Sequence, residues 1–178
     1  TASMATQSAL TGHLVLSTLH TNDTAGALPR LINMGIEPFL ITSSINVVIA
    51  QRLVRRICPR CREEMKVPQK LLDGLYAEVQ SIQAVNTKDR SRIPTVPKLF
   101  YGRGCPECNH GYKGRVGIFE VMSITPEIEE LTIDKKPADD IKVSAIKSGM
   151  ITMRQDGILK AFAGETTIDE VFQAVTID

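Results

Sequence analysis

The four cysteines of the 178-residue chain stand in two matching stretches, Cys58-Pro59-Arg60-Cys61 and Cys105-Pro106-Glu107-Cys108. A Cys-x-x-Cys turn directs two thiolates to one point, and two such turns complete a tetrahedral shell of four sulfurs. Soft thiolate ligands in this geometry select zinc or, less often, iron. The predicted ligands of one structural metal ion, Zn²⁺ in preference to iron, are Cys58, Cys61, Cys105 and Cys108.

Two other uses of paired cysteines fit the sequence less well. Disulfides belong to oxidising compartments, and the sequence has no secretory pattern at its start. A thioredoxin-like redox site uses one Cys-x-x-Cys in a βαβ setting, whereas this chain carries two matched ones. The two Cys-x-x-Cys turns, residues 58–61 and 105–108, will be called the knuckles. The loop between them, residues 62–104, is longer than the roughly 15–20 residues of a common zinc ribbon. We therefore expect the metal to close a whole subdomain at its neck.

Composition limits the classes of partner. Lys and Arg total 21 against 20 Asp and Glu, so the net charge is +1 and favours neither nucleic acid nor a membrane surface. No apolar run is long enough to span a bilayer. The start, Thr1-Ala2-Ser3-Met4, predicts that the chain is a piece cut from a longer protein.

The first residues predict a helix followed by a buried strand. Apolar spacing indicates a helix over residues 2–10. Residues 13–19 are almost continuously apolar, as in a strand of a parallel sheet that helices cover on both faces. His20 follows this strand, and open α/β sheets bind ligands beyond the carboxyl ends of their strands. The sequence therefore places His20 where a phosphate would bind.

The segment leading to the first knuckle predicts two helices and a strand. Residues 23–34 have helical spacing, and Pro29 within them is expected to kink or split the helix. Pro38 suits the first turn of a second helix. The mixed, partly β-branched residues of 47–57 fit a strand or a helix, and we favour a strand that delivers Cys58 to the metal.

Beyond the first knuckle the expected elements are mainly helical. In chain order we predict a helix over residues 71–85, a solvated loop over 86–97, a strand over 115–121, helices opened by Thr125-Pro126 and by Pro137, and a capping box at 167–170 for the last helix.

Residues 11–22, Thr11-Gly12-His13-Leu14-Val15-Leu16-Ser17-Thr18-Leu19-His20-Thr21-Asn22, resemble the histidine box of the secretion ATPases. These are the hexameric motors of type II secretion and of type IV pilus assembly. The resemblance covers nearly the whole chain apart from the loop between the knuckles. It continues through residues 34–40, 50–59, 104–109, 111–120 and 164–171.

The resemblance implies an α/β fold, the C-terminal portion of a RecA-like P-loop ATPase core with an inserted tetracysteine zinc subdomain and a helical C-terminal tail. Residues 1–57 would belong to the core, residues 58–122 to the zinc subdomain and residues 123–178 to the helical subdomain. Retraction motors of the family lack the knuckles, so the resemblance favours pilus assembly or secretion over retraction.

The same resemblance implies the chemistry and the partners. The full-length protein would hydrolyse ATP with Mg²⁺, with His20 contacting or sensing the γ-phosphate. His13 would be a second member of that box or would only make a structural hydrogen bond. The protein would be a homo-hexamer, cytoplasmic and peripheral to the inner membrane, and would work with the membrane platform and cytoplasmic components of a pilus or secretion machine. No nucleic-acid partner is expected.

Two departures from the family pattern bear on function. The chain contains no Gly-x-x-x-x-Gly-Lys-Ser/Thr loop, which in the family lies upstream, with an acidic motif that would end just before Thr1. Phosphoryl transfer depends on that loop and its metal, so the chain alone is expected to be inactive. The turn between Asn109 and Gly111 is one residue shorter than usual, which predicts a tighter turn with His110 on the surface. The alternative function is a free-standing zinc-ribbon module that binds nucleic acid or protein.

Overall fold

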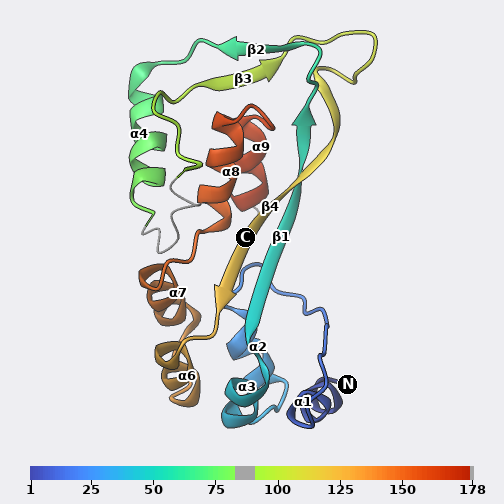
Figure 1. Cartoon of the computed structure of the whole chain (residues 1–178), viewed down its shortest axis with the longest axis vertical. Helices are drawn as coiled ribbons and strands as arrows, with labels where there is room; N and C mark the ends of the chain where they lie inside the picture. Colours follow the sequence, from blue (N-terminus) through green and yellow to red (C-terminus); the bar gives the residue numbers. More distant parts are fainter. Residues whose placement is uncertain (83–90, 177–178) are drawn as a thin grey trace. The chain divides into compact units, whose positions relative to one another are not determined.

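The computed structural model describes residues 1–82 and 91–176 (Figure 1). Contacts within the chain group it into two units. The first unit contains residues 1–50 and 120–150, and the second contains residues 51–119 and 151–178. Strands β1 (Val47–Ile57) and β4 (Tyr112–Ser123) pair as a two-stranded sheet, and the division between units falls within both strands. The knuckles belong to the second unit.

The first unit is helical around the ends of these two strands. Its helices are α1 (Ala2–Leu10), α2 (Ala27–Asn33), α3 (Pro38–Ser44), α6 (Pro126–Ile133) and α7 (Ala138–Lys147). Helix α3 starts with Pro38, and the Thr125 hydroxyl caps α6 by accepting from the Ile128 N–H. The buried core comprises Ala25, Leu28, Ile36, Ile41, Met122, Ile128, Ile141, Ala145 and Met150.

A buried carboxylate fixes the segment before α2 to strand β4. Glu120 is 2% exposed, and its Oε1 accepts hydrogen bonds from the N–H and the hydroxyl of Thr24, at 3.1 and 2.6 Å. Asp23 in turn accepts from the Gly26 N–H at 2.9 Å. These bonds satisfy polar groups that would be costly to bury alone.

The second unit packs helices against a small antiparallel sheet. Strand β2 (Arg62–Met65) pairs with β3 (Leu99–Gly102), with Arg62 opposite Gly102 and Met65 opposite Leu99. Its helices are α4 (Gln69–Gln80), α8 (Met153–Phe162) and α9 (Ile168–Thr176). The core comprises Leu75, Val79, Ile82, Leu99, Ile158, Leu159, Ala161, Phe162, Ile168 and Val171.

Helix α8 is held by polar contacts at its start and in its middle. Thr152 and Gln155 form a reciprocal capping box at its N-terminus, a Thr-x-x-Gln pattern that is present in the sequence and that we did not predict. The buried Asp156 accepts from Lys160 Nζ at 2.6 Å and from the Phe119 N–H at 2.9 Å. Arg92 also pairs with Asp156, so the buried charge is compensated.

The predicted strand over residues 13–19 is wrong. These residues have no regular structure, and Leu14 and Leu16 are both 89% exposed. A strand requires a hydrogen-bonded neighbour, and within residues 1–82 and 91–176 no segment pairs with residues 13–19. Both sheets in this part of the chain have two strands, so the RecA-like parallel core stays a prediction.

Other predicted elements are confirmed or adjusted at their ends. The helices over residues 2–10 and from Pro38, the strand over 47–57, the strand over 115–121 and the helices after Thr125 and Pro137 are confirmed. The predicted kink at Pro29 is wrong, because α2 begins at Ala27 and places Pro29 in its first turn, where no helical N–H partner is lost.

The remaining predictions to compare with the structure are the elements between the knuckles and the division into domains. The helix predicted over 71–85 spans Gln69–Gln80, and residues 83–85 of that prediction lie outside the described residues. Of the predicted loop 86–97, residues 91–97 are irregular and residues 86–90 lie outside the described part. The three-part division at residues 57 and 122 stays a prediction; contacts place α8 and α9 in the same unit as the knuckles.

None of the helices in the described part of the chain has the length and hydropathy of a membrane-spanning helix.

Candidate metal centre

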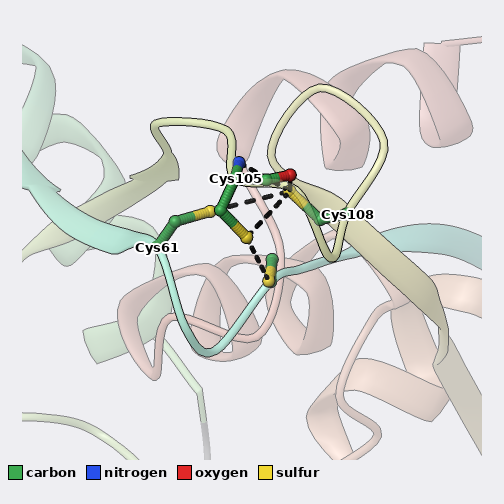
Figure 2. Close-up of side chains that lie close together, drawn as sticks. Cys61, Cys105 and Cys108 are labelled. Carbon is green, nitrogen blue, oxygen red and sulfur yellow. Dashed lines mark hydrogen bonds between the residues drawn. The ribbon is translucent and has the colours of Figure 1, made fainter.

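The four cysteine sulfurs converge on one point (Figure 2). The Sγ–Sγ distances are 3.9 Å from Cys58 to Cys105, 3.8 Å from Cys61 to Cys108, and 3.6 Å from Cys105 to Cys108. All four sulfurs lie within 4.8 Å of one another. A tetrahedron with Zn–S bonds of about 2.3 Å has sulfurs about 3.8 Å apart. The free thiols therefore already have the spacing of a four-sulfur metal shell.

The two knuckles are built in the same way. Each Cys-x-x-Cys closes a turn in which the N–H of the second cysteine donates to the carbonyl of the first, at 3.3 Å for Cys61 and 3.2 Å for Cys108. Strand β1 leads into the first knuckle and β2 leaves it, while β3 leads into the second and β4 leaves it. The β2–β3 pairing holds the two turns together, so each pair of thiols faces the other.

The thiols differ in their affinity for protons. Burial raises the pKa of Cys61 to about 12. Burial also acts to raise the pKa of Cys108, but hydrogen bonds from the backbone and thiol of Cys105 and from the Gly111 backbone outweigh it and lower the pKa to about 7. The Cys105 N–H donates to Cys108 Sγ at 3.2 Å. Because only thiolates bind metal, loading the site must release protons.

The turn after the second knuckle is tight, as predicted from its being one residue shorter than the family pattern. Asn109 and Tyr112 exchange two backbone hydrogen bonds of 2.9 Å across His110 and Gly111, which have φ values of 48° and 87°. Positive φ at both central residues is the mark of a two-residue type I′ turn. His110 is exposed, as predicted, and the four sulfurs leave no ligand position for it.

Gly111 lies where the two knuckles touch through their backbones. Its carbonyl accepts from the Cys58 N–H at 2.9 Å, and a Cβ at Gly111 would lie 2.2 Å from the Gly102 oxygen. Only a residue without a side chain permits this approach, which ties the first knuckle to the second.

We expect Gly111→Ala to lower the free energy of unfolding by about 2 kcal/mol, because the positive φ and the collision with Gly102 both add cost. Gly114→Ala is the matched control, since Gly114 also has a positive φ, of 80°, but open space around it. The control should cost about 1 kcal/mol. Chemical denaturation measures both, and equal losses would contradict the role of the close approach.

An ion pair links strand β1 to the start of α9. Glu170 accepts from Arg55 Nε at 2.9 Å, from Arg55 Nη2 at 2.6 Å and from the Arg55 backbone N–H at 2.9 Å. The Arg55 guanidinium also lies 4.1 Å from the centre of the Tyr112 ring. The hydrogen bonds from Arg55 hold the pKa of Glu170 below its usual value. The pair therefore stabilises the fold above that usual pKa and ceases to do so as the pH falls through the lowered pKa.

Thr167 and Glu170 form only one half of the capping box predicted for α9. Thr167 Oγ1 does accept from the Glu170 N–H, at 3.4 Å, but the Glu170 carboxylate faces Arg55. No local sequence pattern indicates the grouping of Arg55, Tyr112 and Glu170, because Arg55 and Glu170 lie 115 positions apart in the chain.

The two candidate catalytic histidines belong to the first unit, whereas the cysteines belong to the second. His13 is exposed, and its Nδ1 lies 3.1 Å from Thr11 Oγ1 and 3.2 Å from the Ser8 carbonyl, just after α1. This is the structural hydrogen bond considered as the alternative for His13. His20 is also exposed. The catalytic roles of both histidines stay predictions.

Comparisons with known proteins cover nearly the whole chain. A family model described as "Type II/IV secretion system protein" matches residues 1–173. The chain is 45% identical over 172 residues to the type IV pilus assembly ATPase PilB of Myxococcus xanthus, covering 96% of this chain and 28% of the relative. It is 43% identical to PilB of Thermus thermophilus, with 96% and 18% covered. It is 41% identical to the type II secretion system ATPase E of Vibrio cholerae, with 97% and 32% covered.

Proposed function

Because the chain belongs to the family of type II/IV secretion system proteins, we propose that it is the C-terminal part of a hexameric motor ATPase that powers type IV pilus assembly or type II secretion. The observation that carries the proposal is the identity of 41–45% over nearly the full chain to relatives named as ATPases of these two systems. The chain spans less than a third of the length of each of these relatives. The activity proposed is therefore that of the longer protein.

In this proposal the chain contributes only part of the nucleotide site. It contains no phosphate-binding Gly-x-x-x-x-Gly-Lys-Ser/Thr loop, so ATP and Mg²⁺ bind chiefly to the rest of the protein, whose core is RecA-like. His20 contacts the γ-phosphate or the attacking water. His13, in the same box, supports this segment through its hydrogen bonds near the end of α1.

The four cysteines hold a structural zinc ion in the proposed protein. The spacing of their sulfurs fits a tetrahedral shell, and four thiolates leave no open position for a substrate. The ion would supply folding free energy rather than catalysis. Iron with the same ligands is the alternative metal.

The proposed site of action is the cytoplasmic face of the inner membrane. The partners would be the membrane platform and cytoplasmic components of a pilus or secretion machine, and not nucleic acid. The near balance of 21 cations and 20 anions supports a protein partner over a nucleic acid.

ATP turnover tests the proposal directly. We expect the intact protein to hydrolyse ATP in the presence of Mg²⁺ and the 178-residue chain alone to release no phosphate, because phosphoryl transfer requires the P-loop. Turnover by the isolated chain would contradict the assignment of the nucleotide site. An intact protein without ATP turnover would instead favour the free-standing zinc-ribbon module.

A further inference from the structure

Three chain segments next to the knuckles contact the same turn: the segment before the first knuckle, the segment after it and the segment after the second knuckle. This turn, residues 163–167, joins α8 to α9 and will be called the α8–α9 turn. Before the first knuckle, the Ile57 N–H donates to the Glu165 carbonyl at 2.9 Å, and Thr166 Oγ1 donates to the Arg55 carbonyl at 2.8 Å. These bonds lie within three residues of the ligand Cys58.

The other two segments make contacts of the same kind. Arg62, which directly follows the ligand Cys61, donates through Nη1 to the carbonyls of Ala163 and Gly164, at 3.4 and 3.3 Å. Tyr112, which directly follows Gly111, places its hydroxyl 3.1 Å from Thr167 Oγ1. The α8–α9 turn is thus bonded to the chain on both sides of the first knuckle and after the second.

Arg55 and Glu170 fasten this arrangement. Glu170, in the first turn of α9, takes three hydrogen bonds from Arg55, and the Arg55 guanidinium lies over the Tyr112 ring. One side chain therefore contacts both the strand that follows the second knuckle and the helix that follows the turn. The pairing of a carboxylate with Nε and Nη2 fixes the orientation of Arg55 as well as its position.

We propose that Arg55, Tyr112 and Glu170 are positioning residues for the metal centre, which hold the α8–α9 turn against the knuckles and so couple metal binding to the position of that turn. The inference rests on the metal site of the proposed function. Substitution of residues that orient the metal ligands without touching the metal commonly lowers the affinity of the protein for the metal. Because coupling between two events is reciprocal, loosening the turn must weaken metal binding, and removing the metal must loosen the turn.

The first test measures zinc affinity of the 178-residue chain by competition with a chromophoric chelator. We expect Arg55→Ala and Glu170→Ala each to weaken zinc binding by about tenfold or more. The double variant should lose less zinc affinity than the two single losses combined, because both substitutions break the same Arg55–Glu170 side-chain pair. Equal zinc affinity in wild type and the double variant would overturn the proposal while leaving the zinc site itself intact.

A second ion pair in the same unit provides the matched control. Arg154 Nε donates to Glu78 Oε1 at 2.7 Å, and its guanidinium lies 4.6 Å from the centre of the Phe172 ring. Arg154 therefore resembles Arg55 in its partners, but its contacts lie on α4 and α9 and not on the knuckle segments. We expect Arg154→Ala to leave zinc affinity within about twofold of wild type, a change too small to reflect lost ligand positioning. An equal loss of zinc affinity in Arg154→Ala would show that the effect of Arg55→Ala comes from general destabilisation of the fold, and it would overturn the proposal.

Milder substitutions keep the test valid where an alanine variant does not fold. Tyr112→Phe keeps the ring beneath Arg55 and removes only the hydroxyl near Thr167, and Arg55→Lys keeps the charge without the paired hydrogen bonds. Both should show weaker zinc binding with unchanged far-ultraviolet circular dichroism. Hydrogen exchange of the wild type gives a second readout. Chelation should raise exchange in the α8–α9 turn and the start of α9, and unchanged protection there would overturn the coupling. A wild-type chain that binds no zinc would contradict the zinc site of the proposed function as well as the coupling.

Discussion

Replacing Cys105 by serine is expected to abolish metal binding and unfold the second unit of the chain. A structural Zn²⁺ supplies about 10–16 kcal/mol of apparent binding free energy in small zinc domains. This binding free energy is as large as the about 5–15 kcal/mol by which whole domains are typically stable, so its loss is enough to unfold a small unit. A hydroxyl does not replace a thiolate as a soft ligand, so the three remaining sulfurs form an incomplete shell.

Metal analysis and hydrogen exchange together check this expectation. The wild type should contain close to one zinc per chain, and the Cys105→Ser variant close to none. Exchange should rise over the described residues of the second unit, 51–82, 91–119 and 151–176, whereas the helices α6 and α7 of the first unit should stay protected. Glu107→Gln is the matched control, because Glu107 lies within the same knuckle but its side chain is exposed and pairs with the exposed cations Arg60 and Lys113.

Two results would contradict the prediction. A wild type without zinc or iron, with cysteines joined in disulfides, would exclude a metal centre. A Cys105→Ser variant that keeps the melting temperature of the wild type would show that the metal does not stabilise the fold. Iron in place of zinc would change the metal but not the reasoning, since four thiolates suit either ion.

The extent of unfolding also separates what the sequence predicts from what the structure adds. The knuckle spacing alone predicts loss of structure over residues 58–121, because these residues lie between or beside the ligands. The contacts of Arg55, Arg62 and Tyr112 extend the expected loss to the α8–α9 turn, whose contacting residues lie 111, 102 and 55 positions further along the chain. Such contacts have no local sequence pattern, and so only the folded chain reveals them.

Local patterns were reliable where a single residue type fixes the backbone. Pro38 at the first position of α3 and Thr125 at the cap of α6 were both correct, because the ring of proline and the hydroxyl of threonine act within one helical turn. The cysteine spacing was sufficient to predict the convergence of the four sulfurs for the same reason. Each knuckle is a turn closed over four residues, and the two identical turns need only be brought together.

Residues 13–19 show where such patterns fail. Their continuous apolar character predicted a strand, but strand formation is decided by a neighbouring strand and not by the segment itself. In the described part of the chain the segment has no such neighbour, and Leu14 and Leu16 are exposed. Exposed leucines at this level are unusual for a segment of β-type sequence, which is consistent with the proposal that the longer protein supplies the rest of the core.

The second large effect is expected at His20, which directly follows this segment. In the intact protein we expect His20→Ala to lower ATP turnover by on the order of 10²-fold, because a hydrogen bond to the γ-phosphate or the attacking water would be lost in the transition state. Nucleotide affinity should change little, since the P-loop backbone and lysine supply most of the binding. The exposure of His20 leaves its imidazole accessible to a phosphate held by another part of the protein.

Steady-state turnover and nucleotide binding, measured on the intact protein, separate this role from a structural one. His110→Asn is the control, because His110 is also exposed and asparagine tolerates the positive φ of that turn, so the variant should keep wild-type turnover. His13→Ala should lose less than His20→Ala, since the His13 ring contacts Ser8 and Thr11 beside α1. Unaltered turnover in His20→Ala would show that the histidine takes no part in the reaction. A fall in nucleotide affinity with an unchanged kcat would instead assign His20 to binding in the ground state, because the loss of uniform binding raises KM without changing kcat.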